Sequence, residues 1–486
     1  MNVLIVSAEA FPFAKVGGLA DVIGSLPAAL IAQGVDARVL MPGYGLIPHS
    51  KYAIHHQFSY NFDHRQGRSE VHVYMCIYQG VTFYFLQGWP YFGQESSVYT
   101  EFSWDMPRFI WFNQAAMAFL WELRARLNWM PDVVNVNDWH TGLLPFMIAY
   151  ERWKSDWKHL ATVTTIHNIA YSGNYAGGFL FQAGIPGRDD WRARRYGLTD
   201  NMLGISVSYS DMISTVSPRY AQEIQHPYAG YELAELIRER RDDLRGILNG
   251  LDVKLWNPST DPKLFQNFDA DNCAELRIEN KRQLQRSMGL RQDDNVLLVG
   301  MVSRLAWQKG FDLAVPALRR ALSEFEIQVV ILGTGEYAIE RDVESLARQF
   351  PDKARAYLTF DGAVAQQIYG GCDLFLMPSH FEPCGMGQMI AMRYGALPLV
   401  RETGGLADTV QNYDDGQADE GTGFVFQQEE ARAVYNTLRW ALATYHQRPQ
   451  AWQRMQDRAM RQDFSWERSA REYMALYRRA SDKRPR

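Results

Sequence analysis

The chain has 486 residues, of which 47% are hydrophobic and 22% are charged, and its net charge at pH 7 is −5. This length predicts about three domains, or two large ones, with sizeable cores. The small negative charge excludes the basic character that is typical of nucleic-acid-binding proteins and of proteins bound to anionic membranes. We therefore expect neither kind of partner.

The four cysteines show no Cys-x-x-Cys spacing, which favours reduced thiols and a cytoplasmic location. The start of the sequence, MNVLIVSAEAFPF, has no basic region, and Glu9 interrupts its apolar run. We expect a strand here instead of a signal peptide. No apolar run approaches the roughly 18 residues that a membrane helix needs.

The amino-terminal half alternates between strand and helix patterns. We expect strands at 2–7 and 37–41, a strand-rich stretch at 52–86, and helices at 18–34 and 108–127. Pro27 predicts either a kink or a later start for the first helix, because proline cannot donate to the helical ladder. Residues 186–246 are rich in charge, and their RERRDD run (238–243) is most simply a solvated helical face.

Polar residues follow two further predicted strands of this half. VVNVN (133–137) leads to Asp138 and ATVTTI (161–166) leads to His167 and Asn168. Ligands bind at the carboxyl ends of strands in open α/β sheets, so these residues predict a ligand-binding edge.

The second half reads as a regular strand–helix series, and we place the domain boundary at about 246–249. Its predicted strands are VLLVGMV (296–302), VVIL (329–332), AYLTF (356–360), DLFLM (373–377) and LPLV (397–400), with helices at 311–325, 337–350 and 364–370. The fold class is therefore α/β with parallel sheets.

One loop sequence occurs at both ends of the chain. Lys15-Val-Gly-Gly-Leu-Ala-Asp21 is matched by Glu402-Thr-Gly-Gly-Leu-Ala-Asp408, and each copy follows an apolar strand. A glycine backbone lets a phosphate approach closely, and a helix N-terminus favours negative charge. The alternative is a generic loop repeated by chance.

Six blocks in this order resemble bacterial glycogen synthases and plant starch synthases. They are KVGGLADVIGSLP at Lys15, TIHNIAYSG at Thr165, NGLD at Asn249, SRLAWQKG at Ser303, HFEPCG at His380 and TGGLADTV at Thr403. The resemblance implies two facing Rossmann-like domains of the GT-B type with a deep interdomain cleft. Residues 1–246 would form the acceptor side, 247–463 would bind the nucleotide sugar, and a helix at 464–480 would pack back on the first domain.

The activity implied by the resemblance is retaining transfer of glucose from ADP-glucose to the non-reducing end of an α-1,4-glucan, without a cofactor. Arg304 and Lys309 would neutralise the departing diphosphate; solvated loop cations are the alternative interpretation. His167 would hold the sugar's 6-hydroxyl. Glu382 would lie beside the donor glucose; a helix-capping carboxylate is the alternative.

Further contacts are implied for the nucleotide sugar, and weaker ones for the acceptor. Phe360 stands where relatives often stack a tyrosine on adenine. The remaining donor contacts are Lys15, Gly17, Gly18, Asp21, Asp138, Asn168, Asn249, Cys384, Gly385, Thr403, Gly404 and Gly405, and the acceptor contacts are Tyr99 and Trp139. The aromatic segments that begin at Trp89 and Phe102 could also line a glucan path, although core packing is the simpler interpretation of any one ring.

Two departures from the wider family limit the mechanism. Ile390 occupies the place of a second glutamate that many retaining relatives carry, and Gly387 replaces a hydroxyl residue. No residue is assignable as a carboxylate nucleophile, so a same-face substitution is preferred, in which the leaving phosphate takes the acceptor's proton.

Other functions stay open at this point. Asp269-Ala-Asp271 matches the Asp-x-Asp metal signature of a different transferase architecture, but a three-residue match arises easily by chance, and no metal site is expected. The chain could also glucosylate a small sugar, act as a phosphorylase that needs pyridoxal phosphate, or bind glucan without catalysis.

Overall fold

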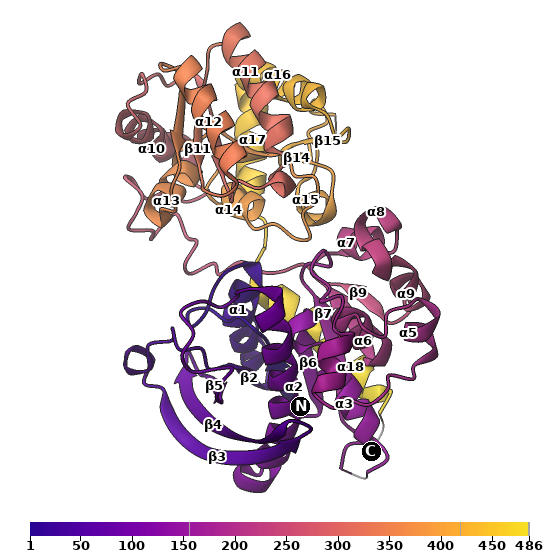
Figure 1. Cartoon of the computed structure of the whole chain (residues 1–486). Coiled ribbons are helices and arrows are strands. Elements are labelled where there is room, and N and C mark those ends of the chain that lie inside the picture. The colour runs from indigo at the N-terminus through magenta and orange to yellow at the C-terminus, as the bar shows by residue number, and fades with distance from the viewer. Residues whose placement is uncertain (155, 418, 485–486) are drawn as a thin grey trace. The chain divides into compact units, whose positions relative to one another are not determined.

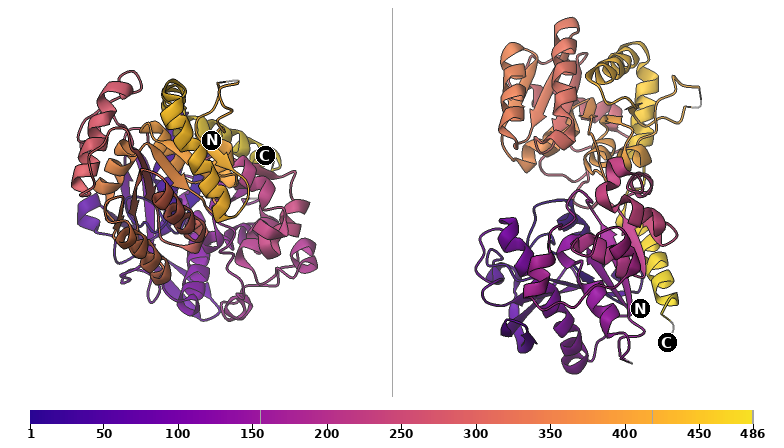
Figure 2. Two further views of the ribbon diagram at one scale, coloured as in Figure 1. Left: turned by 90° about the horizontal axis from the view of Figure 1, so that it is seen from above. Right: turned by 45° about the vertical axis from the view of Figure 1, so that its right-hand side comes forward.

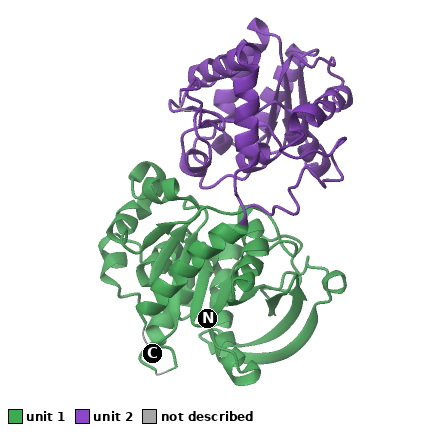
Figure 3. Ribbon diagram, turned by 180° about the vertical axis from the view of Figure 1, so that it is seen from behind, with its two compact units in different colours: residues 1–250, 466–486 green, residues 251–465 purple. Residues whose placement is uncertain are grey.

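The computed structural model describes residues 1–154, 156–417 and 419–484. The chain divides into two compact units (Figures 1 and 3). Unit 1 contains residues 1–250 and 466–486, and unit 2 contains residues 251–465. Within the described ranges, no helix is both long enough and apolar enough to cross a membrane.

Within the described residues, unit 1 is built on a nine-stranded sheet in the order β3-β4-β5-β2-β1-β6-β7-β8-β9. β4 pairs antiparallel with β3 and β5, and the other neighbours are parallel. Figure 1 shows β3 and β4 as long curved strands. The strands are β1 (Asn2–Val6), β2 (Asp36–Pro42), β3 (His55–His64), β4 (Gly67–Tyr78), β5 (Val81–Gln87), β6 (Val133–Asn137), β7 (Ala161–Ile166), β8 (Met212–Thr215) and β9 (Leu244–Gly246).

The central strands are buried, including their asparagine and threonine side chains, because helices cover the parallel part of a sheet on both faces. β6 and β7 are buried at every position. The helices and 3-10 turns of unit 1 are α1 (Gly18–Ala32), η1 (His49–Tyr52), α2 (Phe102–Leu127), η2 (Trp139–Thr141), α3 (Leu144–Glu151), α4 (Gly177–Gln182), α5 (Trp191–Arg195), α6 (Met202–Tyr209), α7 (Pro218–Glu223), α8 (Pro227–Gly230), η3 (Tyr231–Leu233), α9 (Ala234–Glu239) and α18 (Trp466–Asp482).

Prolines bear on two helix starts of unit 1, and only the start of α2 differs from the predicted position. α1 begins at Gly18 and continues through Pro27, so the later start that Pro27 suggested is wrong. α2 begins at Phe102 and contains Pro107. The carbonyl of Glu101 accepts bonds from the amides of Trp104 and Asp105, and these bonds start the helix before the proline.

Unit 2 has a parallel sheet of six strands in its described part, in the order β12-β11-β10-β13-β14-β15. Counted along the chain, this is the 3-2-1-4-5-6 order of the dinucleotide-binding fold. The predicted class, two Rossmann-like α/β domains, is therefore confirmed. The strands are β10 (Leu297–Val302), β11 (Ile327–Leu332), β12 (Ala354–Tyr357), β13 (Leu374–Met377), β14 (Leu397–Arg401) and β15 (Phe424–Phe426).

The helices of unit 2 connect these strands and then continue beyond the last of them. They are α10 (Cys273–Ser287), η4 (Trp307–Lys309), α11 (Phe311–Glu324), α12 (Tyr337–Gln349), α13 (Gly362–Gly371), α14 (Gly387–Arg393), α15 (Gly404–Thr409), α16 (Ala431–Gln447) and α17 (Pro449–Met460). β12 ends at Tyr357, earlier than predicted, so Phe360 lies in the loop before α13.

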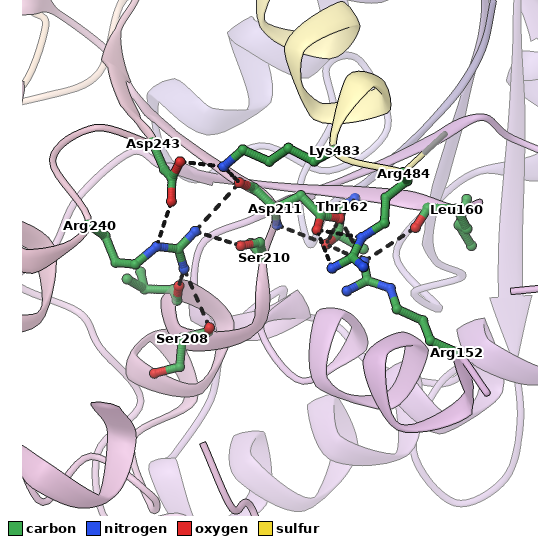
Figure 4. A network of polar contacts seen from close by, with 11 residues as sticks. Arg152, Leu160, Thr162, Ser208, Ser210, Asp211, Arg240, Asp243, Lys483 and Arg484 are labelled. Carbon is green, nitrogen blue, oxygen red and sulfur yellow. Dashed lines mark hydrogen bonds and ion pairs between the residues drawn. The ribbon is translucent and has the colours of Figure 1, made fainter. Parts of the chain in front are cut away.

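The last helix belongs to unit 1. α18 packs on α1, β6, β7 and β8, and it is the yellow helix along unit 1 in the right-hand view of Figure 2. Beyond it, Lys483 donates to the carbonyl of Asp211 at 2.8 Å, and Arg484 Nε donates to the Asp211 carboxylate at 2.8 Å (Figure 4). These bonds fix Lys483 and Arg484 to the residue directly before β8.

Arg240 corrects the prediction of a solvated helical face at 238–243. α9 ends at Glu239, and Arg240 is buried. Its guanidinium donates to Asp243 at 2.9 Å and to the carbonyl of Ser210 at 2.7 Å (Figure 4). A charge run is a poor guide to exposure where the fold provides carbonyl acceptors for a buried arginine.

Candidate functional site

The unit 2 part of the candidate site lies where the strand order reverses. β10 and β13 are neighbours, and the chain continues to β11 on one side and to β14 on the other. The loops that leave these two strands, residues 303–310 and 378–386, start from one sheet edge. Ligands bind at such an edge in open α/β sheets.

Two residues predicted to be catalytic, one from each loop, form an ion pair at this edge. Lys309 Nζ lies 2.6 Å from Glu382 Oε2, and the Ser379 hydroxyl donates to the same oxygen at 3.1 Å. The side chains of Lys309 and Glu382 are only 18% and 7% exposed. Arg304, in the first loop, is exposed to solvent. The edge therefore presents a paired cation and carboxylate, and the loop that carries Lys309 also carries an exposed arginine.

The two loops are joined by main-chain contacts, so they position each other. The amide of His380 donates to the carbonyl of Gln308 at 2.9 Å, and the Gln308 side chain donates to the carbonyl of Phe381 at 3.2 Å. The imidazole of His380 stacks on Trp307, with 4.2 Å between ring centroids and a 12° angle between the rings. Gly310 has φ +71°, and a Cβ there would lie 2.0 Å from the carbonyl oxygen of Pro378.

The two Gly-Gly pairs in the repeated loop differ in what a side chain at these positions would meet. In unit 2, α15 begins at Gly404, and a Cβ on Gly404 or Gly405 would lie 2.0 Å from the carbonyl oxygens of Glu382 and Cys384 respectively. In unit 1, α1 begins at Gly18, and a Cβ on Gly17 or Gly18 would meet nothing within 4 Å. Packing explains the unit 2 pair, whereas within the described residues nothing occupies the space beside the unit 1 pair.

The other predicted residues of unit 2 lie in the segments that follow β12, β13 and β14. Cys384 is buried, and Thr403 is the residue before α15. Gly385 has φ +71°, a left-handed conformation that favours glycine. Phe360 is 90% exposed, with its ring free for stacking. Ile390 is buried in α14, so its side chain belongs to the core.

In unit 1 the corresponding reversal lies between β1 and β6. The loop after β1 carries Lys15, whose ammonium lies 2.6 Å from the carboxylate of Asp21 in α1. The loop after β6 carries Asp138, and the next strand, β7, ends directly before His167. The topology therefore brings the predicted residues of this unit to one sheet edge.

Glu9 holds this edge together, and sequence reasoning missed its role. Its carboxylate is buried and accepts bonds from the amides of Val16 and Gly17 at 2.7 and 2.8 Å. The hydroxyl of Tyr99 donates to the other carboxylate oxygen at 2.6 Å. The signal in the sequence is an acidic residue placed just after an apolar strand and before a glycine loop. Glu9 thus connects the first glycine loop to a predicted acceptor residue.

For the nucleotide-sugar donor that the sequence resemblance implies, we expect Glu9→Ala to weaken binding about tenfold, because two loop amides lose their acceptor and the loop loses its anchor. Tyr99→Phe is the matched control, since it removes one bond to Glu9 but leaves both amide bonds intact. Steady-state kinetics should show a raised KM for the nucleotide sugar in Glu9→Ala only. An equal rise in both variants would contradict a loop-anchoring role.

His167 is fixed as a neutral imidazole. Its amide donates to Asp138 Oδ1 at 2.7 Å, and its Nε2 lies 2.9 Å from Asn137 Oδ1. The Asn137 amide nitrogen donates to the carbonyl of Val6, so the amide oxygen faces the ring and Nε2 carries the proton. Burial lowers the pKa of His167 to about 3 and raises the pKa of Asp138 to about 7. Asp138 also adopts φ +56°, an unusual backbone for a residue other than glycine.

The two predicted acceptor residues differ in exposure. Trp139 is 8% exposed and packs edge-on against Phe109, so most of its indole is core. Tyr99 is partly exposed and stacks on His140 at 5.0 Å between centroids. Two buried atoms, His140 Nδ1 and Asn249 Oδ1, have no hydrogen-bond partner in the described part of the chain.

The buried histidines predict an acid-dependent loss of stability. Burial first, and then the charge of Arg108, lower the pKa of His140 to about 3. Below pH 6.5 the unfolded chain binds a proton at this position that the folded chain does not. The free energy of unfolding then falls as the pH falls, by about 1.4 kcal/mol per pH unit for each such histidine.

We expect His140→Gln to lower this slope by about 1.4 kcal/mol per pH unit between pH 6 and 4.5. Urea unfolding, followed by tryptophan fluorescence at a series of pH values, measures the slope independently of the absolute stability. An unchanged slope would show that His140 is protonated in the folded protein.

The Asp-x-Asp sequence lies away from these edges, in the turn before α10. Asp269 accepts bonds from the amides of Asp271 and Asn272, and Asp271 pairs with Arg461 at 2.5 Å. These contacts give the motif a local structural role. Among the described residues, no group of three or more His, Cys, Asp or Glu side chains is arranged to hold a metal ion.

Comparisons with known proteins agree over the whole length. Residues 2–239 match the family described as "Starch synthase catalytic domain", and residues 280–458 match "Glycosyl transferases group 1". The glycogen synthase of Geobacillus thermodenitrificans is 42% identical over 482 residues, which cover 98% of this chain and 97% of that protein.

Two solved structures are similar to this fold. The catalytic domain of starch synthase IV from Arabidopsis thaliana, bound to ADP and acarbose, shares 31% identity with a TM-score of 0.87, and 99% of each chain is covered. The sucrose-phosphate synthase of Thermosynechococcus elongatus shares 17% identity with a TM-score of 0.60 over 98% of each chain, and this likeness concerns the fold alone.

Proposed function

Because the chain belongs to the glycogen and starch synthase family of glycosyltransferases, we propose that it transfers glucose from ADP-glucose to the non-reducing end of an α-1,4-glucan with retention of configuration. The observation that carries this proposal is the Lys309–Glu382 pair at the strand-order reversal of unit 2, in a loop that also carries the exposed Arg304. The two solved relatives have the GT-B fold, in agreement with the predicted class.

Breaking the bond between glucose and ADP makes the diphosphate more negative and the sugar more positive in the transition state. Preorganised charges aimed at these two centres are the most effective catalytic device available. Arg304 and Lys309 neutralise the departing diphosphate, and Glu382 stabilises the positive sugar ring. The pairing of Lys309 with Glu382 at 2.6 Å holds both side chains in place before the substrate arrives.

Two observations support an adenine nucleotide in the donor. Phe360 offers an exposed ring for stacking on a purine. The relative from Arabidopsis is described with ADP bound, which supports an adenine nucleotide here. Gly404 and Gly405 bring the start of α15 against the Glu382 loop, where the helix N-terminus favours phosphate.

The polar residues of unit 1 suit neutral hydroxyl groups. Near pH 7, His167 is neutral and the carboxyl of Asp138 is only partly ionised, so both can form hydrogen bonds with sugar hydroxyls. Asn249 Oδ1 is buried without a partner among the described residues, and a hydroxyl donor would satisfy it. The open space beside Gly17 and Gly18 leaves their backbone accessible to the substrate.

Retention is assigned to a same-face substitution. A double displacement needs a carboxylate nucleophile, and the position where many relatives carry a second glutamate is the buried Ile390. In the same-face step, the bond from the anomeric carbon to the diphosphate breaks while the acceptor's 4-hydroxyl oxygen bonds to the same carbon. The departing phosphate oxygen takes the hydroxyl proton, so ADP leaves with that proton.

The experiment supplies the purified chain with ADP-glucose or UDP-glucose and with glycogen, maltotriose or a small monosaccharide acceptor. The proposal expects ADP release that depends on glucan, together with new glucose that β-amylase removes from the non-reducing ends. Release of nucleotide only with a monosaccharide would show that the acceptor is a small sugar and not a glucan. Binding of glycogen without nucleotide release would contradict catalysis.

A further inference from the structure

Trp89 is an exposed indole on a turn that directly follows β5. Its side chain is 82% exposed. Trp111, from the same aromatic-rich part of the sequence, is only 2% exposed and belongs to the core. The two aromatic segments noted in the sequence therefore contain both core rings and exposed rings, and Trp89 is more exposed than Phe102 (46%) and Trp104 (41%).

The turn that carries Trp89 is held rigidly. The amide of Gly88 donates to the carbonyl of Phe92 at 3.0 Å, and the amide of Phe92 donates back to Gly88 at 3.0 Å. A Cβ on Gly88 would lie 2.3 Å from the ring of Trp111, so the turn is pinned against the core. Glu95 accepts bonds from the amides of Gly45 and Gly93 at 3.1 and 2.9 Å. The fixed backbone of this turn thus holds the Trp89 side chain in solvent.

A groove of about 190 Å³ lies beside this indole. It is lined by His72, Gln87, Gly88, Trp89, Pro90, Phe92, Gly93 and Gln94. The lining has an aromatic face, two side-chain amides and an imidazole, and it contains no Lys, Arg, Asp or Glu among the described residues. Amides donate and accept hydrogen bonds with hydroxyls, and a flat apolar ring suits the apolar face of a sugar. This chemistry fits a neutral polyhydroxyl ligand and offers no cation for a phosphate.

The groove lies on the same sheet edge as the unit 1 part of the candidate site. β5 pairs with β2 and β2 with β1, all parallel, so their carboxyl ends share one edge. At about 4.8 Å per strand, the end of β5 is displaced by about 10 Å from the end of β1. The segment that leaves β5 carries both Trp89 and Tyr99, and Tyr99 binds Glu9 in the loop after β1.

We propose that Trp89 and this groove bind an outer portion of the glucan acceptor, several glucose units away from the end that reacts. This inference rests on the proposed glucan acceptor, and it assigns to unit 1 a subsite that distinguishes long chains from short ones. A long chain that extends along the sheet edge covers the reacting end and fills the whole groove, whereas a trisaccharide at the reacting end does not fill it.

The test compares Trp89→Ala with Trp153→Ala. Trp153 is a matched control because it is 78% exposed and follows α3, which leads to the opposite edge of the same sheet. We expect Trp89→Ala to raise the KM for glycogen about tenfold, with the kcat and the KM values for maltotriose and ADP-glucose unchanged. Trp89→Phe should keep most of the affinity, because it keeps a ring for stacking.

A second readout needs no catalysis. Native electrophoresis in gels that contain glycogen should retard the wild type, Trp89→Phe and Trp153→Ala, and should retard Trp89→Ala less. Equal retardation and an equal KM for glycogen in both alanine variants would overturn the proposed subsite, as would an equal rise in the KM for maltotriose. If the wild type transfers no glucose to either acceptor, the proposed function fails, while the gels still test the groove.

Discussion

Lys309→Ala is expected to lower kcat by about three orders of magnitude, the upper range for losing one preorganised charge aimed at a transition state. The loss has two sources. The departing diphosphate loses a cation, and the buried carboxylate of Glu382 loses a partner that lies 2.6 Å away. The steady-state rate of ADP release, measured with glycogen in excess, gives the effect on kcat directly.

In the proposed mechanism Arg304 acts on the same developing charge, so its variants test the same mechanism. Arg304→Lys should already lose at least about tenfold in rate, because the planar guanidinium holds two phosphate oxygens and an ammonium does not. The double variant Arg304→Ala/Lys309→Ala should lose less than the product of the two single losses. Arg348→Lys is the matched control, since this arginine of α12 is 69% exposed and lies outside the loops. A fully multiplicative double variant would contradict a shared role.

Glu382→Gln is expected to lower kcat by about two orders of magnitude, because the amide keeps the shape of the side chain but removes the negative charge beside the sugar. Glu429→Gln is the matched control, since Glu429 also contacts the 378–386 loop, through His380 at 2.5 Å, but is half-exposed. Circular dichroism and thermal unfolding establish that both variants are folded. A folded Glu382→Gln variant with near-normal kcat would remove Glu382 from the catalytic group.

Much of the fold follows from the hydrophobic pattern, because buried parallel strands leave runs of apolar residues that are visible locally. Polar residues that directly follow predicted strands also indicate the two sheet edges that we propose as the ligand-binding edges. The pattern is less informative about the ends of elements: β12 stops at Tyr357 and leaves Phe360 in a loop. Element ends depend on capping and loop contacts that a periodicity does not contain.

Contacts between distant residues are the part that a sequence pattern does not contain. The Lys309–Glu382 pair joins residues that are 73 positions apart, and the motifs predict each residue alone, without the other as its partner. In the sequence Glu9 is only an interruption of an apolar run, although it anchors the first glycine loop. The charged neighbours of Arg240 predict a solvated side chain, whereas its acceptors include a carbonyl from another segment.

The two copies of Gly-Gly-Leu-Ala-Asp show the same limit. Their identical letters predict a common role, but Gly404 and Gly405 are required by the close approach of another loop, and Gly17 and Gly18 are not. Among the described residues, no protein atom lies close to Gly17 or Gly18. The approach of a ligand is therefore a possible reason for glycine only in the unit 1 copy. A repeated motif therefore indicates a shared loop shape more securely than a shared structural requirement for its glycines.

The central claim is that Arg304 and Lys309, and no divalent ion, neutralise the departing diphosphate. The direct measurement is the initial rate of ADP release from ADP-glucose, with glycogen present, in excess EDTA and in added Mg²⁺. The account predicts equal rates in the two conditions. A rate that EDTA abolishes and Mg²⁺ restores would contradict it.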